Sequence, residues 1–452
     1  MFTNKKILIL GMARSGYEAA KVLATRNNTV ILNDGGSKDK QNPDHIKELE
    51  ELGVTLLFDE HPDDLLDTSF DYVIKNPGIA IDHKYVVKAR ELGIEVINEA
   101  EMAYRLLPND VTLIGITGTN GKTTTTTLTY QMIKESGKRV HLAGNIGYPL
   151  CSFLDKLQSG DIIVMEVSSQ QLENMIQFKP HIALMTNLSE AHLEFFKTYD
   201  YYKQVKLKLF AKQDENDIAI LNINDPEIMP AAADLKANVK YFSSCQEING
   251  ASYLDNALWY YGEKIMDRDQ FLLVGNHNVE NALGAMMIAK EVGVDNASIV
   301  AVLSTFKGVE HRLEFVDTID EVRYYNDTEA TNTRCTQIAL SSFSDPVILL
   351  LGGYERGQNF HDLDAYISPV RTIIGIGACR DRVQQYGDEM HIPTFTFEYL
   401  KDAMTYIQTI VQPKDVVLLS PASASWDQYK QCEDRGDEFK QFVQNLKEQE
   451  DA

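Results

Sequence analysis

The chain has 452 residues, of which 44% are hydrophobic, and this length and composition predict two to four domains with full-sized cores. Its 43 basic and 66 acidic residues give a formal net charge of −23 at pH 7. This charge argues against a nucleic-acid partner or an anionic membrane surface, because both are bound by clustered lysine and arginine. The five cysteines are scattered without C-x-x-C spacing, so we expect reduced thiols in a cytoplasmic protein.

The first 100 residues alternate strands with helices. The opening MFTNKKILILGMARSG has an apolar part only one strand long before a glycine turn, so we expect neither a signal peptide nor membrane insertion. A helix is predicted over YEAAKVLAT (17–25), and strands over KKILILG (5–11), TVILND (29–34), DYVIKNPG (71–78) and IEVINE (94–99). This alternation is typical of a doubly wound parallel sheet.

A glycine turn follows the first predicted strand. GMARSG (11–16) has the spacing of a dinucleotide-binding turn, with Ala13 in the middle glycine position, and Asp34 ends the next strand. We interpret this pattern as a site for a nucleotide or a nucleotide-sugar. A tight strand–helix crossing, which also favours glycine, is the alternative.

A second glycine turn carries stronger chemistry. VTLIGIT (111–117) predicts a buried strand, and TLTYQMIKESGK (127–138) predicts a helix that ends at Gly137. Between them, GTNGKTT (118–124) places backbone N–H groups and a helix N-terminus toward an anion. Lys122 adds a positive charge for phosphate oxygens. The glycine of the general P-loop pattern would stand at 116 rather than 115 or 118, but the strand and helix context favours nucleotide binding.

Three more strands, each ending in polar residues, are predicted over DIIVMEVSS (161–169), HIALMTNLS (181–189) and DIAILNIND (217–225). Glu166 lies inside an apolar strand, where a carboxylate is costly without a partner, so we interpret it as a Mg²⁺ ligand rather than a cap. His192, which follows a strand end, is a second ligand or a structural histidine. On spacing alone, Lys206 is a solvated helix lysine.

The remaining segments repeat the alternation. Asn278 and Asn281 lie on a helix predicted over 276–290 and could read an adenine edge or cap the helix. The turn-rich segment FKGVEHRLEF (306–315) contains Arg312, which could reach a γ-phosphate, and Asp327 is a ribose partner or a helix cap. Three further parallel strands are predicted at 347–353, 372–377 and 415–422. We therefore expect an α/β protein with domains at 1–100, 101–308 and 309–452.

These motifs together resemble the Mur ligases, in their order and over essentially the whole chain. The resemblance is closest to the members that join D-glutamate to UDP-N-acetylmuramoyl-L-alanine. The motifs are GITGTNGKTT (115–124), AGNIG (143–147), MEVSSQQLE (165–173), NHNVENAL (276–283), HRLEF (311–315), YNDTEATN (325–332), LLGGYERG (350–357) and SPASASWDQYKQCEDRGDEF (420–439).

The resemblance implies a Rossmann-like N-terminal domain for the UDP-sugar, a central P-loop ATPase domain, and a Rossmann-like C-terminal domain for the amino acid. Its ATP-binding positions are Gly118, Thr119, Asn120, Gly121, Lys122, Thr123, Thr124, Asn278, Asn281, Arg312 and Asp327. Its positions for the UDP-sugar are Ser15, Asp34, Gly78 and Asn145, and those for glutamate are Thr331, Arg356 and Ser425. Its positions for two Mg²⁺ ions are Thr123, Glu166, His192 and Lys206, of which Lys206 aligns with a carbamylated lysine.

The chemistry that the resemblance implies is ATP-dependent amide formation through an acyl phosphate. Positioning and charge neutralisation supply most of the catalysis, with Lys122, His192, Lys206 and Arg312 as the catalytic residues. The expected substrates are small molecules, the expected oligomeric state is a monomer, and the implied role is peptidoglycan precursor synthesis.

Four positions differ from what is usual in this family. Glu329 and Glu194 stand where lysine and aspartate are usual, and Gln170 and Cys432 each replace an aromatic residue. By Coulomb's law, a charge reversal at 329 matters by a few kcal/mol if the site is partly buried, and by about 1 kcal/mol or less if it is exposed.

Other functions remain open at this point. A paralogue could ligate another amino acid, such as L-glutamate, or act on a folate-type substrate. A nicotinamide-dependent oxidoreductase built on GMARSG would leave GTNGKT and the 420–439 block unexplained. A nucleotide-regulated binding protein without turnover is supported by Glu329 alone.

Overall fold

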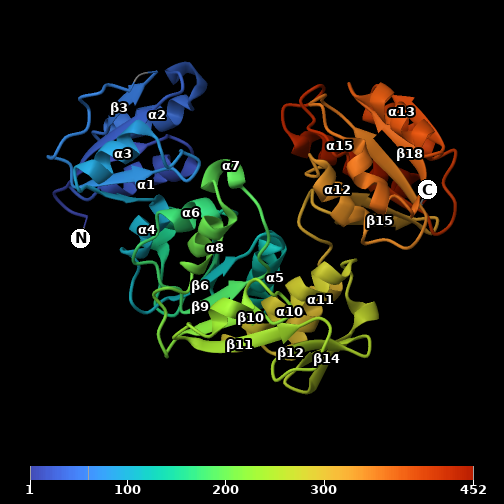
Figure 1. The fold of residues 1–452 in the computed structure, drawn as a ribbon, viewed down its shortest axis with the longest axis horizontal. Helices are drawn as coiled ribbons and strands as arrows, with labels where there is room; N and C mark the ends of the chain where they lie inside the picture. The colour runs from blue at the N-terminus through green and yellow to red at the C-terminus, as the bar shows by residue number, and fades with distance from the viewer. Residues whose placement is uncertain (1, 60, 451–452) are drawn as a thin grey trace. The chain divides into compact units, whose positions relative to one another are not determined.

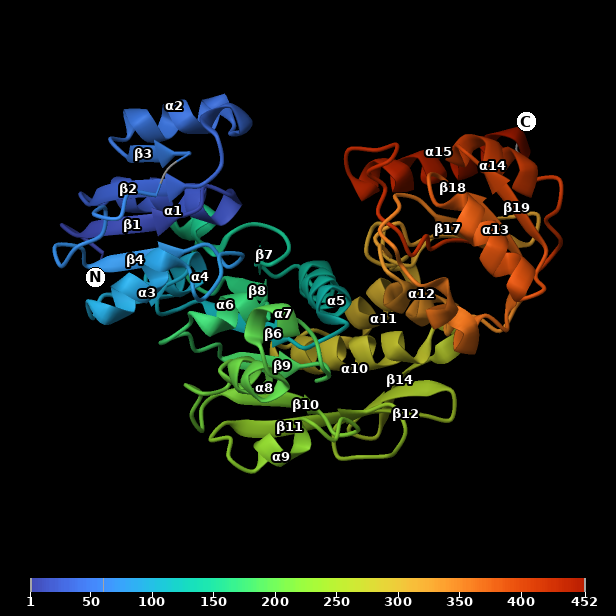
Figure 2. The same ribbon diagram turned by 45° about the horizontal axis from the view of Figure 1, so that its top comes forward.

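A computed structural model describes residues 2–59 and 61–450, which form two compact units (Figures 1 and 2). The first unit lies within Met1–Arg268 and Val279–Leu303, and the second within Asp269–Asn278 and Ser304–Ala452. The first unit contains two β-sheets and the second contains one. No described helix combines the length and the apolar composition that crossing a membrane requires.

The first sheet is five-stranded, fully parallel and ordered β3-β2-β1-β4-β5. Its strands are β1 (Lys6–Leu10), β2 (Thr29–Asp34), β3 (Thr55–Phe58), β4 (Tyr72–Lys75) and β5 (Glu95–Ile97), with helices α1 (Arg14–Ala24), α2 (Pro43–Glu51), α3 (Lys84–Glu91) and α4 (Glu99–Tyr104) and a 3₁₀ turn, η1 (Lys38–Lys40). The chain runs outward from β1 in one direction and returns to start β4 on its other side. Ligands of open α/β sheets bind at the carboxyl end of such a switch point.

The second sheet has nine strands in the order β14-β13-β12-β11-β10-β9-β6-β8-β7. Its parallel strands are β6 (Thr112–Thr117), β7 (Val140–Gly144), β8 (Ile162–Glu166), β9 (Ile182–Met185), β10 (Ile218–Asn222), β11 (Asn238–Ser243) and β12 (Ala251–Leu254), and β13 (Ala257–Tyr260) and β14 (Glu263–Asp267) are antiparallel. β6 lies between β8 and β9, so the loop that follows β6 emerges at the centre of the parallel part.

The helices of this region follow that loop in the chain. They are α5 (Lys122–Glu135), α6 (Ser169–Glu173), α7 (Leu193–Phe196), α8 (Tyr199–Leu207), α9 (Met229–Ala232), α10 (Asn276–Glu291) and α11 (Asn296–Thr305), with 3₁₀ segments η2 (Leu150–Lys156) and η3 (Arg268–Gln270). As predicted, α5 ends just before Gly137, which takes a left-handed φ of 80°.

The third sheet has six strands in the order β15-β16-β20-β17-β18-β19. They are β15 (Glu314–Ile319), β16 (Val322–Asn326), β17 (Val347–Gly352), β18 (Val370–Ile376), β19 (Thr394–Phe397) and β20 (Val416–Leu419), and only the β15–β16 pair is antiparallel among them. Helices α12 (Thr333–Leu340), α13 (Arg380–Glu389), α14 (Leu400–Ile407) and α15 (Cys432–Glu450) and the 3₁₀ segment η4 (Phe360–Tyr366) accompany it.

The apolar runs explain these sheets. Every residue of β17 (VILLLG) is buried, as are the four residues of β20 (VVLL), because a parallel sheet with helices on both faces excludes water from both. The strands predicted from the sequence are therefore confirmed, and so is the α/β fold class.

Candidate functional site

The loop between β6 and α5 has the backbone of an anion-binding turn. Gly118 has a φ of 152° and Gly121 a φ of 78°, conformations that side chains disfavour. A Cβ on Gly118 would lie 1.9 Å from Thr186 Oγ1, so the glycine also allows close packing. α5 begins at Lys122, and its N-cap residue, Gly121, has no side chain to cap the first turn. The first N–H groups of α5 are thus directed toward a ligand position.

The residues after β9 hold this loop in place. Asn187 accepts a hydrogen bond from Thr119 N through its carbonyl (2.9 Å) and from Asn120 N through its side chain (2.9 Å). Thr186 Oγ1 donates to the Asn120 carbonyl at 2.6 Å. The sequence analysis named neither Thr186 nor Asn187 as a site residue. The available signal was the polar end of the strand HIALMTNLS, where ligand-binding residues gather.

Asn281 also reaches the loop. A Cβ on Gly121 would lie 2.1 Å from Asn281 Oδ1, and Thr125 Oγ1 donates to the same oxygen at 3.3 Å. Asn278, one turn earlier on α10, donates to the Val274 carbonyl at 2.8 Å. Asn281 therefore contacts the phosphate-binding helix.

Lys206 is buried rather than solvated. Its side chain projects from α8 with 1% of the residue exposed, and its ammonium donates to Thr117 Oγ1 (3.2 Å) and to the Gly118 carbonyl. Burial, with a smaller effect of Lys122, lowers the pKa of Lys206 well below its usual 10.5, while Glu166 opposes the shift. The neutral amine is therefore strongly favoured, and the interpretation of Lys206 as a surface lysine is wrong.

Glu166 ends β8 beside this lysine. It is 1% exposed, and Oε1 accepts a hydrogen bond from Asn145 Nδ2 at 2.7 Å. Its Oε2 is buried and has no hydrogen-bond partner among the described residues. A buried carboxylate oxygen requires a cation or a donor, so this oxygen fits a Mg²⁺ ligand. His192, in a left-handed conformation before α7, lines a pocket together with Lys206 and Asn145.

That pocket has a volume of about 360 Å³. It brings together residues of the first two sheets: Pro77, Gly78, Lys122, Asn145, Ser168, Ser169, Gln170, His192, Tyr202 and Lys206. Of the predicted residues, Lys122 for phosphate, His192 and Lys206 for metal, and Gly78 and Asn145 for the sugar thus line one cavity in the first unit.

The remaining N-terminal candidates build the adjoining turns. Asp34 accepts hydrogen bonds from Met12 N (2.6 Å) and Gly36 N (2.7 Å), and Ser15 Oγ accepts from Asn76 Nδ2 (3.1 Å). A Cβ on Gly16 would lie 1.9 Å from the Gly11 carbonyl oxygen, so the glycine pattern has the packing reason that the sequence left open. Asp34 and Ser15 hold these turns but do not line the 360 Å³ pocket.

In the second unit, Arg312 pairs with Glu329. Arg312 Nε and Nη2 donate to Glu329 Oε2 at 3.0 and 2.5 Å, and the arginine side chain is 55% exposed. Asp327 accepts from Leu313 N (3.0 Å) and Ser420 Oγ (2.7 Å), and burial raises its pKa to about 7. Glu329, which stands where the resemblance leads us to expect lysine, is therefore bound to Arg312, the arginine predicted to contact ATP phosphate.

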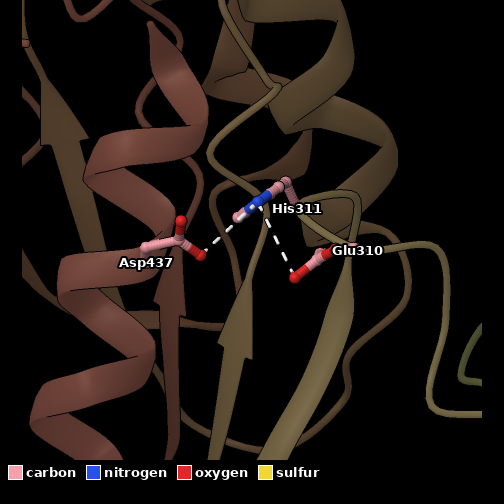
Figure 3. A group of neighbouring side chains, drawn as sticks. All are labelled: Glu310, His311 and Asp437. Atoms are coloured by element: carbon pink, nitrogen blue, oxygen red, sulfur yellow. Dashed lines mark ion pairs between the residues drawn. The ribbon is translucent and has the colours of Figure 1, made fainter.

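The two residues before Arg312 in the chain, Glu310 and His311, form a His–carboxylate group with Asp437 (Figure 3). Glu310, His311 and Asp437 each offer one ligand atom, all within 4.8 Å of one another. Lys440 Nζ lies 3.1 Å from Asp437 Oδ1 and also bonds Glu310. Because this ammonium already neutralises the carboxylates, we interpret the group as an ion-pair network.

The residues predicted to bind glutamate lie on loops that follow the carboxyl ends of β16, β17 and β20 in the third sheet. The Arg356 guanidinium lies 4.5 Å from the centre of the Trp426 ring, and Ser425 Oγ is buried with no hydrogen-bond partner among the described residues. Thr331 N donates to the Glu329 carbonyl at 2.8 Å. Burial raises the pKa of the Cys432 thiol to about 11. The side chain of Glu194 lies outside the described residues.

Comparisons with known proteins cover most of the chain. A family model described as the Mur ligase middle domain matches residues 116–289, and one described as the MurD-like N-terminal domain of Mur ligases matches residues 5–98. A UDP-N-acetylmuramoylalanine–D-glutamate ligase of Bacillus cereus (strain G9842) is 41% identical over 449 residues, which is 98% of each chain. The enzyme of the same name from Bacillus thuringiensis (strain Al Hakam) is 41% identical over 447 residues, again 98% of each chain.

Solved structures show the same fold at lower identity. The MurF ligase of Thermotoga maritima in complex with ADP has a TM-score of 0.59 at 18% identity, over 93% of this chain and 96% of that chain. The UDP-N-acetylmuramate–alanine ligase MurC of Thermotoga maritima has a TM-score of 0.58 at 19% identity, over 98% of this chain and 100% of that chain.

Proposed function

The chain belongs to the family of UDP-N-acetylmuramoylalanine–D-glutamate ligases, and from this premise we propose that it joins D-glutamate to UDP-N-acetylmuramoyl-L-alanine with consumption of ATP. The reaction belongs to peptidoglycan precursor synthesis in the cytoplasm, and we propose that a monomer carries it out. One observation carries the proposal: Lys122 of the phosphate-binding loop and the buried Lys206 line a single cavity with Gly78 and Asn145. Asn145 also donates to Glu166, whose other carboxylate oxygen is buried without a hydrogen-bond partner among the described residues.

ATP binding is assigned to the loop and its neighbours. The N–H groups of 118–123 and the ammonium of Lys122 would hold the β- and γ-phosphates, with Thr124 and Asn281 beside them. Asn278, Arg312 and Asp327 are proposed as further nucleotide contacts.

Two Mg²⁺ ions would be held by Thr123, Glu166, His192 and Lys206. The ions, when bound, supply positive charge for the phosphates during transfer. Glu166 fits this assignment because its buried Oε2 is otherwise unsatisfied among the described residues.

Lys206 is proposed to be a carbamate. The neutral amine that its burial favours is the form that attacks CO₂. An N–C bond forms as one C=O π bond gives its electrons to oxygen, a proton leaves the nitrogen, and the neutral amine becomes an anionic carbamate with oxygen ligands. This modification would remove the cost of a buried ammonium and complete the metal site next to Glu166.

The amide bond is proposed to form in two steps. A carboxylate oxygen of the acceptor attacks the γ-phosphorus of ATP, giving an acyl phosphate and ADP. The amine of glutamate then attacks the acyl carbon, and phosphate leaves with the C–O bond electrons. Lys122 and Arg312 would neutralise charge on the transferred group, and exclusion of water would protect the acyl phosphate.

The two other substrates are assigned to separate regions. The UDP-sugar is proposed to contact Ser15, Asp34, Gly78 and Asn145, within a domain of residues 1–100. ATP is assigned to residues 101–308 and glutamate to residues 309–452, where Thr331, Arg356 and Ser425 would bind its carboxylates. Arginine suits that role because its planar fork matches a carboxylate.

The experiment is phosphate release from ATP with UDP-N-acetylmuramoyl-L-alanine and a panel of amino acids. We expect release with D-glutamate and much less with L-glutamate, alanine or lysine. Efficient ligation of one of the others, with none of D-glutamate, would replace this function with that of a paralogue using a different amino acid.

A further inference from the structure

Arg435 is a buried arginine that none of the assignments above uses. It lies in the first turn of α15 with 1% of the residue exposed. Its Nε donates to Thr328 Oγ1 at 2.9 Å, and its Nη2 donates to the carbonyls of Thr328 (3.0 Å) and Ser423 (3.1 Å). All three acceptors are neutral, so these bonds leave the charge of the guanidinium uncompensated.

The third nitrogen of this guanidinium is unsatisfied. Arg435 Nη1 is buried and has no hydrogen-bond partner among the described residues. It faces the backbone of Gly353, since a Cβ built on that glycine would lie 2.9 Å from it. A larger residue at 353 would close the space in front of this donor.

Another buried arginine, Arg105, has its charge neutralised by carboxylates. Arg105 Nε and Nη2 each lie 2.7 Å from a carboxylate oxygen, of Glu101 and Glu95 respectively. The pKa of Arg105 is raised, whereas burial lowers the pKa of Arg435 to about 10. A buried cation without a paired anion is costly, and an anion that arrives with a ligand can offset that cost.

The contacts of Arg435 fall on three loops, and each of these loops carries a residue assigned to glutamate. Thr328 precedes Thr331 by three residues, Ser423 precedes Ser425 by two, and Gly353 precedes Arg356 by three. Ser425 Oγ is itself buried and has no hydrogen-bond partner in the described part of the chain. Arg435 Nη1 and Ser425 Oγ are therefore two donors, unsatisfied among the described residues, in the region that would bind a dicarboxylate.

We propose that Arg435 is the positioning residue of the amino-acid site: it fixes the loops that carry Thr331, Ser425 and Arg356, and it supplies a buried positive charge for a dicarboxylate substrate. This inference rests on the proposed ligase function. It adds to that function the residue that gives the site its preference for an acidic amino acid.

The test measures the KM for D-glutamate, MgATP and the UDP-substrate, with kcat and the melting temperature, for three variants. Arg435→Lys keeps the charge but loses the fork that reaches both Thr328 and Ser423. Thr328→Val removes one acceptor and leaves the arginine in place. Arg371→Lys is the matched control, because Arg371 is held by Asp415 (2.8 Å) on the same sheet and touches none of the three loops.

We expect Arg435→Lys to raise the D-glutamate KM by about 10- to 100-fold, the effect of losing charge-assisted hydrogen bonds. Thr328→Val should raise it by about threefold to tenfold for the loss of one bond. The KM values for MgATP and the UDP-substrate should stay within about twofold, as should all three values in Arg371→Lys.

An unchanged D-glutamate KM in folded Arg435→Lys, or equal increases in all three KM values, would overturn the proposal and leave Arg435 a purely structural residue. If Arg435→Lys does not fold, the D-glutamate KM of Thr328→Val decides by the same criterion. Failure of the unmodified protein to ligate D-glutamate would instead contradict the proposed function.

Discussion

At the scale of single residues, charge placement distinguishes this chain from the pattern it resembles. Glu329 stands where the resemblance leads us to expect lysine, and its carboxylate pairs with Arg312. An arginine assigned to ATP phosphate is thus already bound to an internal anion. Any phosphate that binds Arg312 must compete with Glu329.

Replacing Glu329 by glutamine should therefore strengthen nucleotide binding. Because Arg312 is largely exposed, the ion pair is weak, and we expect the KM for MgATP to fall by about threefold to tenfold. Steady-state kinetics at fixed ionic strength measure this change. Asp345→Asn is the control, because it removes one carboxylate from another arginine pair of the same unit, Arg323–Asp345. A KM that rises in Glu329→Gln would mean that Glu329 orients Arg312 for the nucleotide.

Lys206 leads to a second prediction at this scale. Lys206→Ala should lose about 10³-fold or more in kcat, because it removes a proposed metal ligand, and short-chain carboxylic acids should restore part of the activity. Lys203→Ala, which removes a half-buried lysine of the same helix that pairs with Glu227, should remain active and should not respond to the acids. Full activity of Lys206→Ala without added acid would refute the carbamate assignment.

At the scale of elements, α4 is joined to the 3₁₀ segment η2 through a buried acid. Glu99, in the first turn of α4, accepts a hydrogen bond from Cys151 N at 2.7 Å, and burial raises the pKa of Glu99 to about 7. A carboxyl group with a raised pKa stabilises the fold below its unfolded value of about 4.5, and this contribution is lost as the pH rises to about 7.

Glu99→Gln should remove this pH dependence while keeping an acceptor for Cys151 N. Relative to the unmodified protein, the variant should gain about 3 kcal/mol of unfolding free energy between pH 4 and pH 8, at about 1.4 kcal/mol per pKa unit. Urea denaturation at both pH values measures the difference. A stability difference that is the same at pH 4 and pH 8 would show that Glu99 does not titrate with folding.

The elements were more predictable than the contacts between them. Apolar runs such as VILLLGG and the glycine spacing of GTNGKTT are local, so the strands and the phosphate-binding turn follow from the sequence. Lys206 on α8 has the local pattern of a surface lysine, and only its packing against Thr117 and Gly118 shows that it is buried. Arg435 was missed for the same reason, because four of its seven neighbours in CEDRGDEF are acidic, which is the pattern of an exposed helix.

At the scale of the whole molecule, each unit carries part of the proposed reaction. The first unit holds the phosphate-binding loop and the 360 Å³ pocket, and the second holds Arg312 and the three loops that Arg435 joins. The 41% identity to the Bacillus cereus ligase extends over 98% of each chain, so the relationship includes both units. We therefore expect the chain to carry out the complete ligation rather than nucleotide binding alone.

Ligation through an acyl phosphate is tested by following oxygen from the acceptor carboxylate to phosphate. UDP-N-acetylmuramoyl-L-alanine labelled with ¹⁸O in its carboxylate is incubated with MgATP, D-glutamate and the protein, and the products are analysed by mass spectrometry. We expect one amide product for each phosphate released, with one carboxylate oxygen transferred to that phosphate. Phosphate without the label, or ATP hydrolysis without the amide product, would contradict ligation through an acyl phosphate.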